Sequence, residues 1–238
     1  MHALPGTYEL VLSLAARHGV SGGRAIDLGA GSGAFVERLQ SAGFQVTGVD
    51  TSDEFAGSAP FVRLNLNDPT FHEKLSAGND LITAIEVIEH LESPIGFLRS
   101  IRELLKPQGI AVLTTPNVEN VPARLKFLTR GRIRTMDEHS DVHISPIFWN
   151  LFERYYVPRA GLRVLDHRLH PGDDFPLTGR RWMVPLFRIL AGLGRNPNLR
   201  GDCHIFVLQR PEESSPGGQG SAIAKETLMR SGRSLGGG

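Results

Sequence analysis

Short apolar strands alternate with helical segments over the first half of the chain, and this alternation limits the fold more than any other feature. Strands are expected within "GRAIDLGAGSG" (23–33), "FQVTGVD" (44–50), "FVRLNLND" (61–68), "DLITAIEV" (80–87) and "GIAVLTTPN" (109–117). Helices are expected at 6–20, 34–43, about 70–77 and about 94–106. The alternation predicts right-handed βαβ crossovers and an α/β, doubly wound parallel sheet that is covered on both faces.

Polar residues stand where these expected strands end. They are Asp27 to Gly33, Asp50, Asn65, Glu86 and Thr115 to Asn117. Ligands of such sheets bind beyond the carboxyl ends of the strands. We therefore expect these residues to line one binding crevice.

The second half of the chain is less regular. Five Lys or Arg residues fall within 124–134 without an acid between them, and residues 118–142 lack strand periodicity. A helix is expected at 145–162, and strands are expected at 163–170 and 203–210. We predict one domain over 1–210, with substrate-side insertions at 118–142 and 172–201. The tail, 211–238, is rich in Gly and Ser and is predicted to be disordered.

Bulk properties exclude several classes of protein. A net charge of +1 gives no global case for a nucleic-acid binder, so any electrostatic preference must be local. Cys203 is the only cysteine, which rules out a disulfide framework and a Cys-rich zinc module. The apolar stretch "LVLSLAA" (10–16) follows Glu9 and no basic segment, so it does not read as a signal peptide. No run reaches the roughly 18 apolar residues of a membrane span, and we expect a cytoplasmic protein.

The stretch "DLGAGSG" (27–33) places three glycines between a strand and a helix. Glycines let the backbone approach a ligand closely, and the helix N-terminus offers free N–H groups. Asp50 ends the next strand, where a carboxylate can accept both hydroxyls of a ribose. The pattern predicts a site for a nucleoside-containing cofactor.

Nicotinamide dinucleotides are the competing cofactors. The third glycine of their fingerprint is replaced by Ala34, which such sites tolerate, so spacing alone does not exclude them. Asp27 favours S-adenosylmethionine over a nicotinamide dinucleotide. Its charge would repel a pyrophosphate but attract the amino or sulfonium group of S-adenosylmethionine. No Tyr-x-x-x-Lys pair follows downstream for dehydrogenase chemistry.

At this point the chain resembles a family, the class I S-adenosylmethionine-dependent methyltransferases. The segments "AIDLGAGSG", "VTGVD" and "EVIEHL…LLKPQGIAVLTTPN" are similar to the family's motifs over roughly residues 20–210. Within the class, "EVIEH" and "TPN" are most similar to the ubiquinone-biosynthesis O-methyltransferase group. The resemblance implies a seven-stranded Rossmann-like sheet whose last strand is antiparallel, and transfer of a methyl group to an oxygen.

The resemblance also implies roles for single residues. Gly29, Ala30, Gly31 and Gly33 would line the methionine and ribose, with Asp27 near the amino group. Asp50 would take the ribose hydroxyls, and Thr51 would lie beside the adenine. Asn65, followed by Leu66, stands where the family has an acid for the adenine amino group, and its amide oxygen can accept the same hydrogen bond. Glu86 would lie on the crevice floor, facing the methyl group.

The stretch "AIEVIEHLESP" (84–94) adds a second carboxylate and an imidazole close behind Glu86. In one interpretation Glu86, Glu89 and His90 bind Mg²⁺, Mn²⁺ or Zn²⁺, and the ion lowers the pKa of the substrate hydroxyl. Small-RNA 2′-O-methyltransferases look similar here and use a Glu–Glu–His set with a distant histidine. Among His139 and His143, this resemblance favours His143 as the fourth ligand.

Two other interpretations of this stretch stay open. His90 or His143 can act as a general base without a metal, because the sulfonium already activates the methyl group and the hydroxyl lacks only deprotonation. Alternatively, Glu89 and His90 only cap the next helix or pair with arginines.

The acceptor is expected to be a glycan or a small metabolite, and its identity does not follow from the sequence. An RNA ribose is the alternative acceptor, and nicotinamide-dependent oxidation is a further alternative function. The segment 180–200 combines five arginines with Trp182, Leu186, Ile189, Leu190 and Leu193 along one helical face. The plainer interpretation of this segment is a lid helix packed on the sheet. The sharper one is contact with an anionic acceptor or peripheral contact with a membrane surface.

Overall fold

The computed structural model describes residues 3–136, 143–179 and 181–212. His139, Arg180 and the predicted tail beyond residue 212 lie outside the described residues.

Seven strands form one sheet in the order β3-β2-β1-β4-β5-β7-β6. The strands are β1 (Gly23–Leu28), β2 (Phe44–Asp50), β3 (Phe61–Arg63), β4 (Asn79–Ile85), β5 (Leu105–Pro116), β6 (Arg163–His170) and β7 (Cys203–Gln209). The first five strands pair in parallel, and β7 enters antiparallel between β5 and β6. The predicted α/β sheet with an antiparallel last strand is confirmed.

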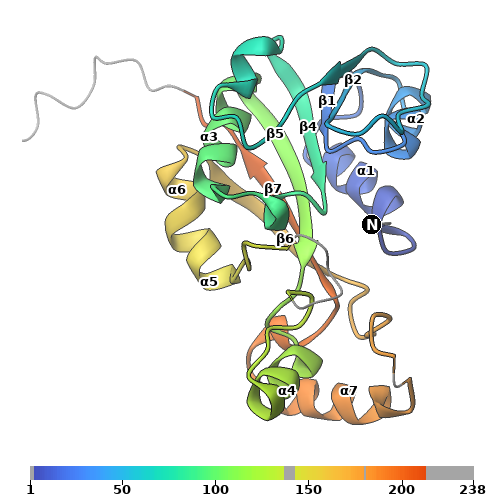
Figure 1. The fold of residues 1–238 in the computed structure, drawn as a ribbon, viewed down its shortest axis with the longest axis vertical. Coiled ribbons are helices and arrows are strands. Elements are labelled where there is room, and N and C mark those ends of the chain that lie inside the picture. The colour runs from blue at the N-terminus through green and yellow to red at the C-terminus, as the bar shows by residue number, and fades with distance from the viewer. Residues whose placement is uncertain (1–2, 137–142, 180, 213–238) are drawn as a thin grey trace, which may run out of the picture.

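Helices cover both faces of this sheet (Figure 1). One face carries α1 (Thr7–Arg17) and α2 (Ala34–Ser41). The other carries α3 (Pro94–Leu104) and a continuous helical segment made of α5 (Trp149–Leu151), a π-helical turn (Phe152–Tyr156) and α6 (Val157–Arg159). Ser93 caps α3 by accepting the Gly96 N–H at 3.2 Å, and Pro94 suits the first helical position because no N–H is needed there.

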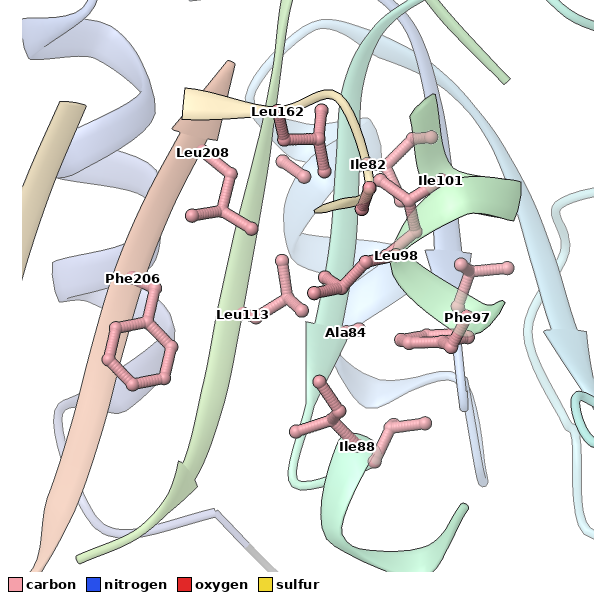
Figure 2. Packing of buried hydrophobic residues seen from close by; sticks show 14 of the residues in the cluster. Ile82, Ala84, Ile88, Phe97, Leu98, Ile101, Leu113, Leu162, Phe206 and Leu208 are labelled. Carbon is pink, nitrogen blue, oxygen red and sulfur yellow. The ribbon is translucent and has the colours of Figure 1, made fainter. Parts of the chain in front are cut away.

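The core beside α3 is built from alternating strand residues and one stripe of the helix. Ile82, Leu113 and Phe206 from three adjacent strands meet Leu98 and Ile101 of α3 (Figure 2). Period-two strand burial and the i, i+3 spacing of the helix are what allow the two elements to interlock. This core fixes the sheet edge at which the polar strand ends meet.

Two predictions around β3 need correction. The strand expected over 61–68 ends at Arg63, and the helix expected over 70–77 is only a 3₁₀ turn, Phe71–Lys74. The reason is local side-chain bonding. The Asn65 amide oxygen accepts the Asn67 N–H at 2.9 Å, and the Asp68 carboxylate accepts the Thr70 N–H at 2.9 Å, so the backbone turns instead of continuing a ladder.

Two further helices, α4 (Val121–Arg130) and α7 (Val184–Leu193), lie beyond the carboxyl end of β5, at the bottom of Figure 1. Short 3₁₀ turns, Arg181–Met183 and Pro197–Leu199, flank α7. A small separate core joins the two helices through Val121, Phe175 and Phe187. The expected packing of this segment on the sheet is therefore replaced by packing against α4.

The lid-helix interpretation would also bury the apolar face identified in the sequence, and that face is exposed. Val184, Phe187 and Ala191 are buried, whereas Trp182, Leu186, Ile189, Leu190 and Leu193 are exposed. Apolar residues occupy almost every side of this helix, so spacing could not identify the stripe that contacts α4. Within the described residues, no helix combines the length and the hydropathy that a transmembrane span requires.

Candidate functional site

A cavity of about 340 Å³ opens at the carboxyl ends of β1, β2 and β4. Of the ten residues predicted to bind a cofactor, seven line it: Gly29, Gly31, Asp50, Thr51, Asn65, Leu66 and Glu86. Asp27, Ala30 and Gly33 lie just outside the lining. The sequence interpretation did not single out Leu64, Asn67, Ile85, Val87 and Leu91, which flank the predicted strand ends and complete the walls.

The glycine turn between β1 and α2 has a backbone that only glycine adopts without strain. Gly29 has φ +81°, and a Cβ there would lie 2.3 Å from Cγ2 of Val87. Gly31 faces open space, and its N–H donates to the Asp50 carboxylate at 2.8 Å. The turn therefore leaves room for a ligand and is held in position by the acid at the end of β2.

Asp50 keeps free acceptor capacity toward the cavity. One carboxylate oxygen accepts the Gly31 N–H and the other accepts the Ser52 N–H, both at 2.8 Å. Each oxygen has a second lone pair, so the pair can still accept two ribose hydroxyls. Asn65 is similar, because its amide oxygen accepts one N–H, from Asn67, and has a lone pair left.

Asp27 is buried beneath the turn at the end of β1. The Thr83 hydroxyl donates to its carboxylate at 2.6 Å. Burial raises the pKa of Asp27 to about 7, and the nearby charge of Asp50 acts in the same direction. A cation bound close to Asp27 would restore the charged form.

Glu86 directly follows β4 in a left-handed backbone conformation, with φ 55°. Its carboxylate accepts the Thr114 hydroxyl at 2.8 Å and the Cys203 thiol at 3.3 Å. Burial raises the pKa of Glu86. A strained backbone at the end of a strand is costly and is typical of a functional position.

Behind Glu86, a 3₁₀ turn (Ile88–His90) brings Glu89 and His90 next to His143, 53 positions further along the chain. The Ile144 and Ser145 N–H groups both donate to the Glu89 backbone carbonyl at 2.9 Å, which anchors this distant segment. One potential ligand atom from each of Glu89, His90 and His143 lies within 4.8 Å of the others. The structure does not bring the Glu86 carboxylate into this group.

The group contains two buried acceptors that face each other without a hydrogen-bond partner. Glu89 Oε1 and His143 Nε2 are 4.0 Å apart, and neither has a hydrogen-bond partner among the residues that the structure describes. His143 Nδ1 lies 2.7 Å from the Thr135 carbonyl oxygen, which assigns the ring proton to Nδ1 and leaves a lone pair on Nε2. Two lone pairs that face each other in a buried site call for a proton or a cation between them.

The charges of this group are also perturbed. Burial raises the pKa of Glu89 well above its usual value, and the Glu86 charge adds to that shift. Burial lowers the pKa of His143. Both shifts remove charge. A divalent cation would reverse the shift of Glu89, because it favours the carboxylate, and it would act in the same direction as the shift of His143, because it favours the neutral imidazole. The three side chains therefore fit a divalent ion.

Thr115 was expected to line the crevice, but it supports the site from behind the cavity wall, and Thr114 and Cys203 support the site without having been predicted. Thr115 donates its hydroxyl to Glu89 Oε2 at 3.0 Å, while Thr114 and Cys203 hold Glu86. The "TTP" end of the fifth strand gave a signal for the threonines. The sequence carried no signal for Cys203 as a site residue, because its position depends on the pairing of β7 with β5.

Comparison with known proteins gives consistent results. A family model described as a methyltransferase domain matches residues 3–155. The ubiquinone biosynthesis O-methyltransferase of Burkholderia vietnamiensis is 32% identical over 107 residues, which are 41% of this chain and 46% of the relative. The mitochondrial enzyme of the same name from Schizosaccharomyces pombe is 31% identical over 149 residues, 58% of this chain and 52% of the relative. The chain thus spans about half the length of the curated relatives it matches.

Solved structures share the fold at low sequence identity. A SAM-dependent methyltransferase from Archaeoglobus fulgidus superposes with a TM-score of 0.56 at 16% identity, covering 85% of this chain and 94% of that one. The magnesium protoporphyrin IX methyltransferase of Synechocystis, with bound SAH, has a TM-score of 0.56 at 14% identity, covering 86% and 82%.

Proposed function

The chain belongs to the methyltransferase-domain family, and on that premise we propose that it transfers the methyl group of S-adenosylmethionine to a hydroxyl oxygen of a glycan or small metabolite. One observation carries this proposal. The cavity that the glycine turn and Asp50 line at one side reaches Glu86 and His90 at the other, so a cofactor site and titratable groups share one space.

Binding would use the groups already described. Asp50 accepts the ribose hydroxyls, Asn65 accepts the adenine amino group, and ionised Asp27 attracts the positive charge of the methionine part. Gly29 and Gly31 let the backbone approach the ligand closely. These contacts would orient the methyl group toward the floor of the cavity, near Glu86.

The reaction is an in-line displacement. The acceptor oxygen forms a bond to the methyl carbon while the carbon–sulfur bond breaks, and the electron pair stays on sulfur in S-adenosylhomocysteine. The hydroxyl proton must leave the oxygen. His90 lines the cavity, and in the form of this proposal without a metal ion its imidazole takes that proton.

We further propose that Glu89, His90 and His143 hold a divalent ion, Mg²⁺, Mn²⁺ or Zn²⁺. Glu89 Oε1 and His143 Nε2 support this, because each is a possible ligand atom that no described residue satisfies with a hydrogen bond. When bound, such an ion lowers the pKa of a coordinated hydroxyl and supplies a nucleophile near neutral pH.

Calorimetry with S-adenosylmethionine and with NAD⁺ tests the cofactor. We expect binding of the first and none of the second, and the reverse result would make the chain an oxidoreductase. Labelled methyl transfer to glycan, metabolite and small-RNA fractions then tests the acceptor. Labelling of RNA alone would instead make the chain a ribose 2′-O-methyltransferase, which a Glu–His–His group also suits.

Metal content after dialysis against each ion, measured by mass spectrometry, tests the ion independently of activity. We expect bound metal in the native protein and at least tenfold less in His143→Ala. The matched control is His18→Ala. His18 directly follows α1 and pairs with Asp166, so this variant should keep the metal. If chelation leaves activity unchanged while His90→Ala abolishes it, the proposed metal ion is wrong and His90 acts as the general base.

A further inference from the structure

The outer surfaces of α4 and α7 expose an unusual number of large apolar side chains. The described residues include twelve exposed large hydrophobics, and seven of them fall on α4, on α7 or on the turn before α7. Leu128, Trp182 and Leu193 are the most exposed, at 82%, 76% and 78%. Burying these groups would be favourable, so the surface is suited to a partner that is itself apolar.

The geometry of α7 shows that these side chains are not part of its packing on α4. Val184, Phe187 and Ala191 are spaced i, i+3, i+7 and form the buried stripe. Leu186, Leu193 and Ile189 project roughly 130°, 150° and 170° away from the centre of that stripe, since successive residues turn by about 100°. The helix therefore has one apolar face toward α4 and a second apolar face toward solvent.

Positive charge is concentrated in the same part of the chain. Segments 121–135 and 171–202 together hold ten Arg or Lys residues and three Asp residues, a formal charge of +7. The whole chain is +1, so the remainder is −6. Arg181 and Arg200 pair with Asp174 and Asp173, and the excess persists after these acids are counted. The apolar surface is thus embedded in the basic part of a polarised molecule.

An apolar hollow of about 610 Å³ lies beside α4 and extends this surface toward Phe148. Phe127, Leu128 and Ile133 line it together with Phe148, which lies five residues after His143. An apolar group of a ligand that enters this hollow would contact Phe148, which belongs to the same segment as His143.

We propose that the outer surface of α4 and α7 binds a membrane that contains anionic phospholipids. Trp182, Leu193 and Leu128 would enter the boundary between headgroups and acyl chains, while the surrounding arginines meet the negative headgroups. This occupant satisfies both features at once. A second copy of the chain would place two surfaces with a formal charge of +7 against each other, which is repulsive. RNA would neutralise the charge but would leave the exposed leucines next to its phosphates. The proposal rests on the surface alone and not on the proposed reaction.

Co-sedimentation with vesicles tests the proposal. Vesicles of phosphatidylcholine with phosphatidylglycerol should bind the protein, vesicles of phosphatidylcholine alone should bind it much less, and added salt should weaken the difference. Leu193→Ser should lower the affinity for the mixed vesicles by about tenfold. Arg130→Gln, at the exposed end of α4, should lower it by about fivefold.

Matched variants on α5 and its π-helical turn, away from this surface, serve as controls. Leu151→Ser and Arg154→Gln remove an exposed leucine and an exposed arginine and should leave vesicle binding unchanged. Binding of S-adenosylmethionine, measured on every variant, shows that the fold is intact and separates this proposal from the proposed function. Equal binding to both vesicle types, equal loss in the control variants, or self-association that Leu193→Ser abolishes would each overturn the proposal.

Discussion

The raised pKa of Asp27 predicts that the affinity for S-adenosylmethionine increases with pH. If only the ionised carboxylate binds the positively charged cofactor, the apparent affinity follows the ionised fraction. With a pKa of about 7, that fraction rises from about one in eleven at pH 6 to about ten in eleven at pH 8. The dissociation constant should therefore be about tenfold lower at pH 8 than at pH 6.

Calorimetry in two buffers of different ionisation enthalpy measures the same coupling directly. Binding should release about half a proton at pH 7, because half of the Asp27 carboxyls carry a proton before binding and none does afterwards. Asp27→Asn separates this proton from those of other groups. It keeps an acceptor for the Thr83 hydroxyl and cannot titrate.

The same shift makes a prediction about stability. A carboxyl whose pKa is raised by folding costs stability as pH rises from about 3.8 to about 7. At 1.36 kcal/mol per pKa unit, the cost at pH 8 is about 4 kcal/mol. Asp27→Asn should therefore raise the melting temperature at pH 8 while it weakens cofactor binding. If Asp27→Asn keeps the native pH dependence of affinity, or gains no stability at pH 8, the reasoning about this residue is refuted.

Three other substitutions have clear expectations. Gly29→Ala should weaken cofactor binding at least tenfold in calorimetry. It should also lower the free energy of unfolding by about 1–3 kcal/mol, because φ is positive and the new Cβ meets Val87. Phe206→Ala should lower the free energy of unfolding in urea by about 3–5 kcal/mol, since its ring is fully buried. Thr115→Val removes a hydrogen bond from the Glu89 carboxylate, so the pKa of Glu89 should rise further and the acid limb of the pH–rate profile should move to higher pH.

Two neighbouring variants supply controls for these effects. Gly31→Ala keeps the positive φ but adds a Cβ with nothing within 4 Å, so its effect on the free energy of unfolding separates backbone strain from the clash at Gly29. Tyr155→Ala truncates an exposed ring that lies 5.5 Å from the Arg159 guanidinium, so it should change stability by less than about 1 kcal/mol. A loss as large as that of Phe206→Ala would contradict the assignment of the core.

Strand ends were predictable because they are local. Asp50 could be placed at the cavity because it ends the second strand, and parallel strands bring their carboxyl ends together. Asn65 also lines the cavity, although β3 ends two residues earlier. Asn65 and Asp68 also show where this reasoning stops. Their side chains bond to the backbone two residues ahead, and that competition ended a strand that the apolar pattern continued.

Long-range contacts were harder to predict. The meeting of Glu89 with His143 came from resemblance, whereas the hydrogen bonds that anchor residues 144 and 145 on the Glu89 carbonyl are visible only in three dimensions. Glu86 was expected to join the same ligand group, but the Thr114 hydroxyl and the Cys203 thiol hold its carboxylate. The sequence left open which face of α7 is exposed, because a helix that is apolar on most sides does not reveal which stripe meets its neighbour.

The position of β7 between β5 and β6 has a consequence for how the protein is made. During synthesis the first five strands leave the ribosome long before residues 203–209, so β5 waits with an unpaired edge. The thiol that holds Glu86 arrives only with that late strand. A nascent chain stalled before residue 203 would therefore hold most of the sheet but no finished binding site, and its open edge would be the place where misassembly begins.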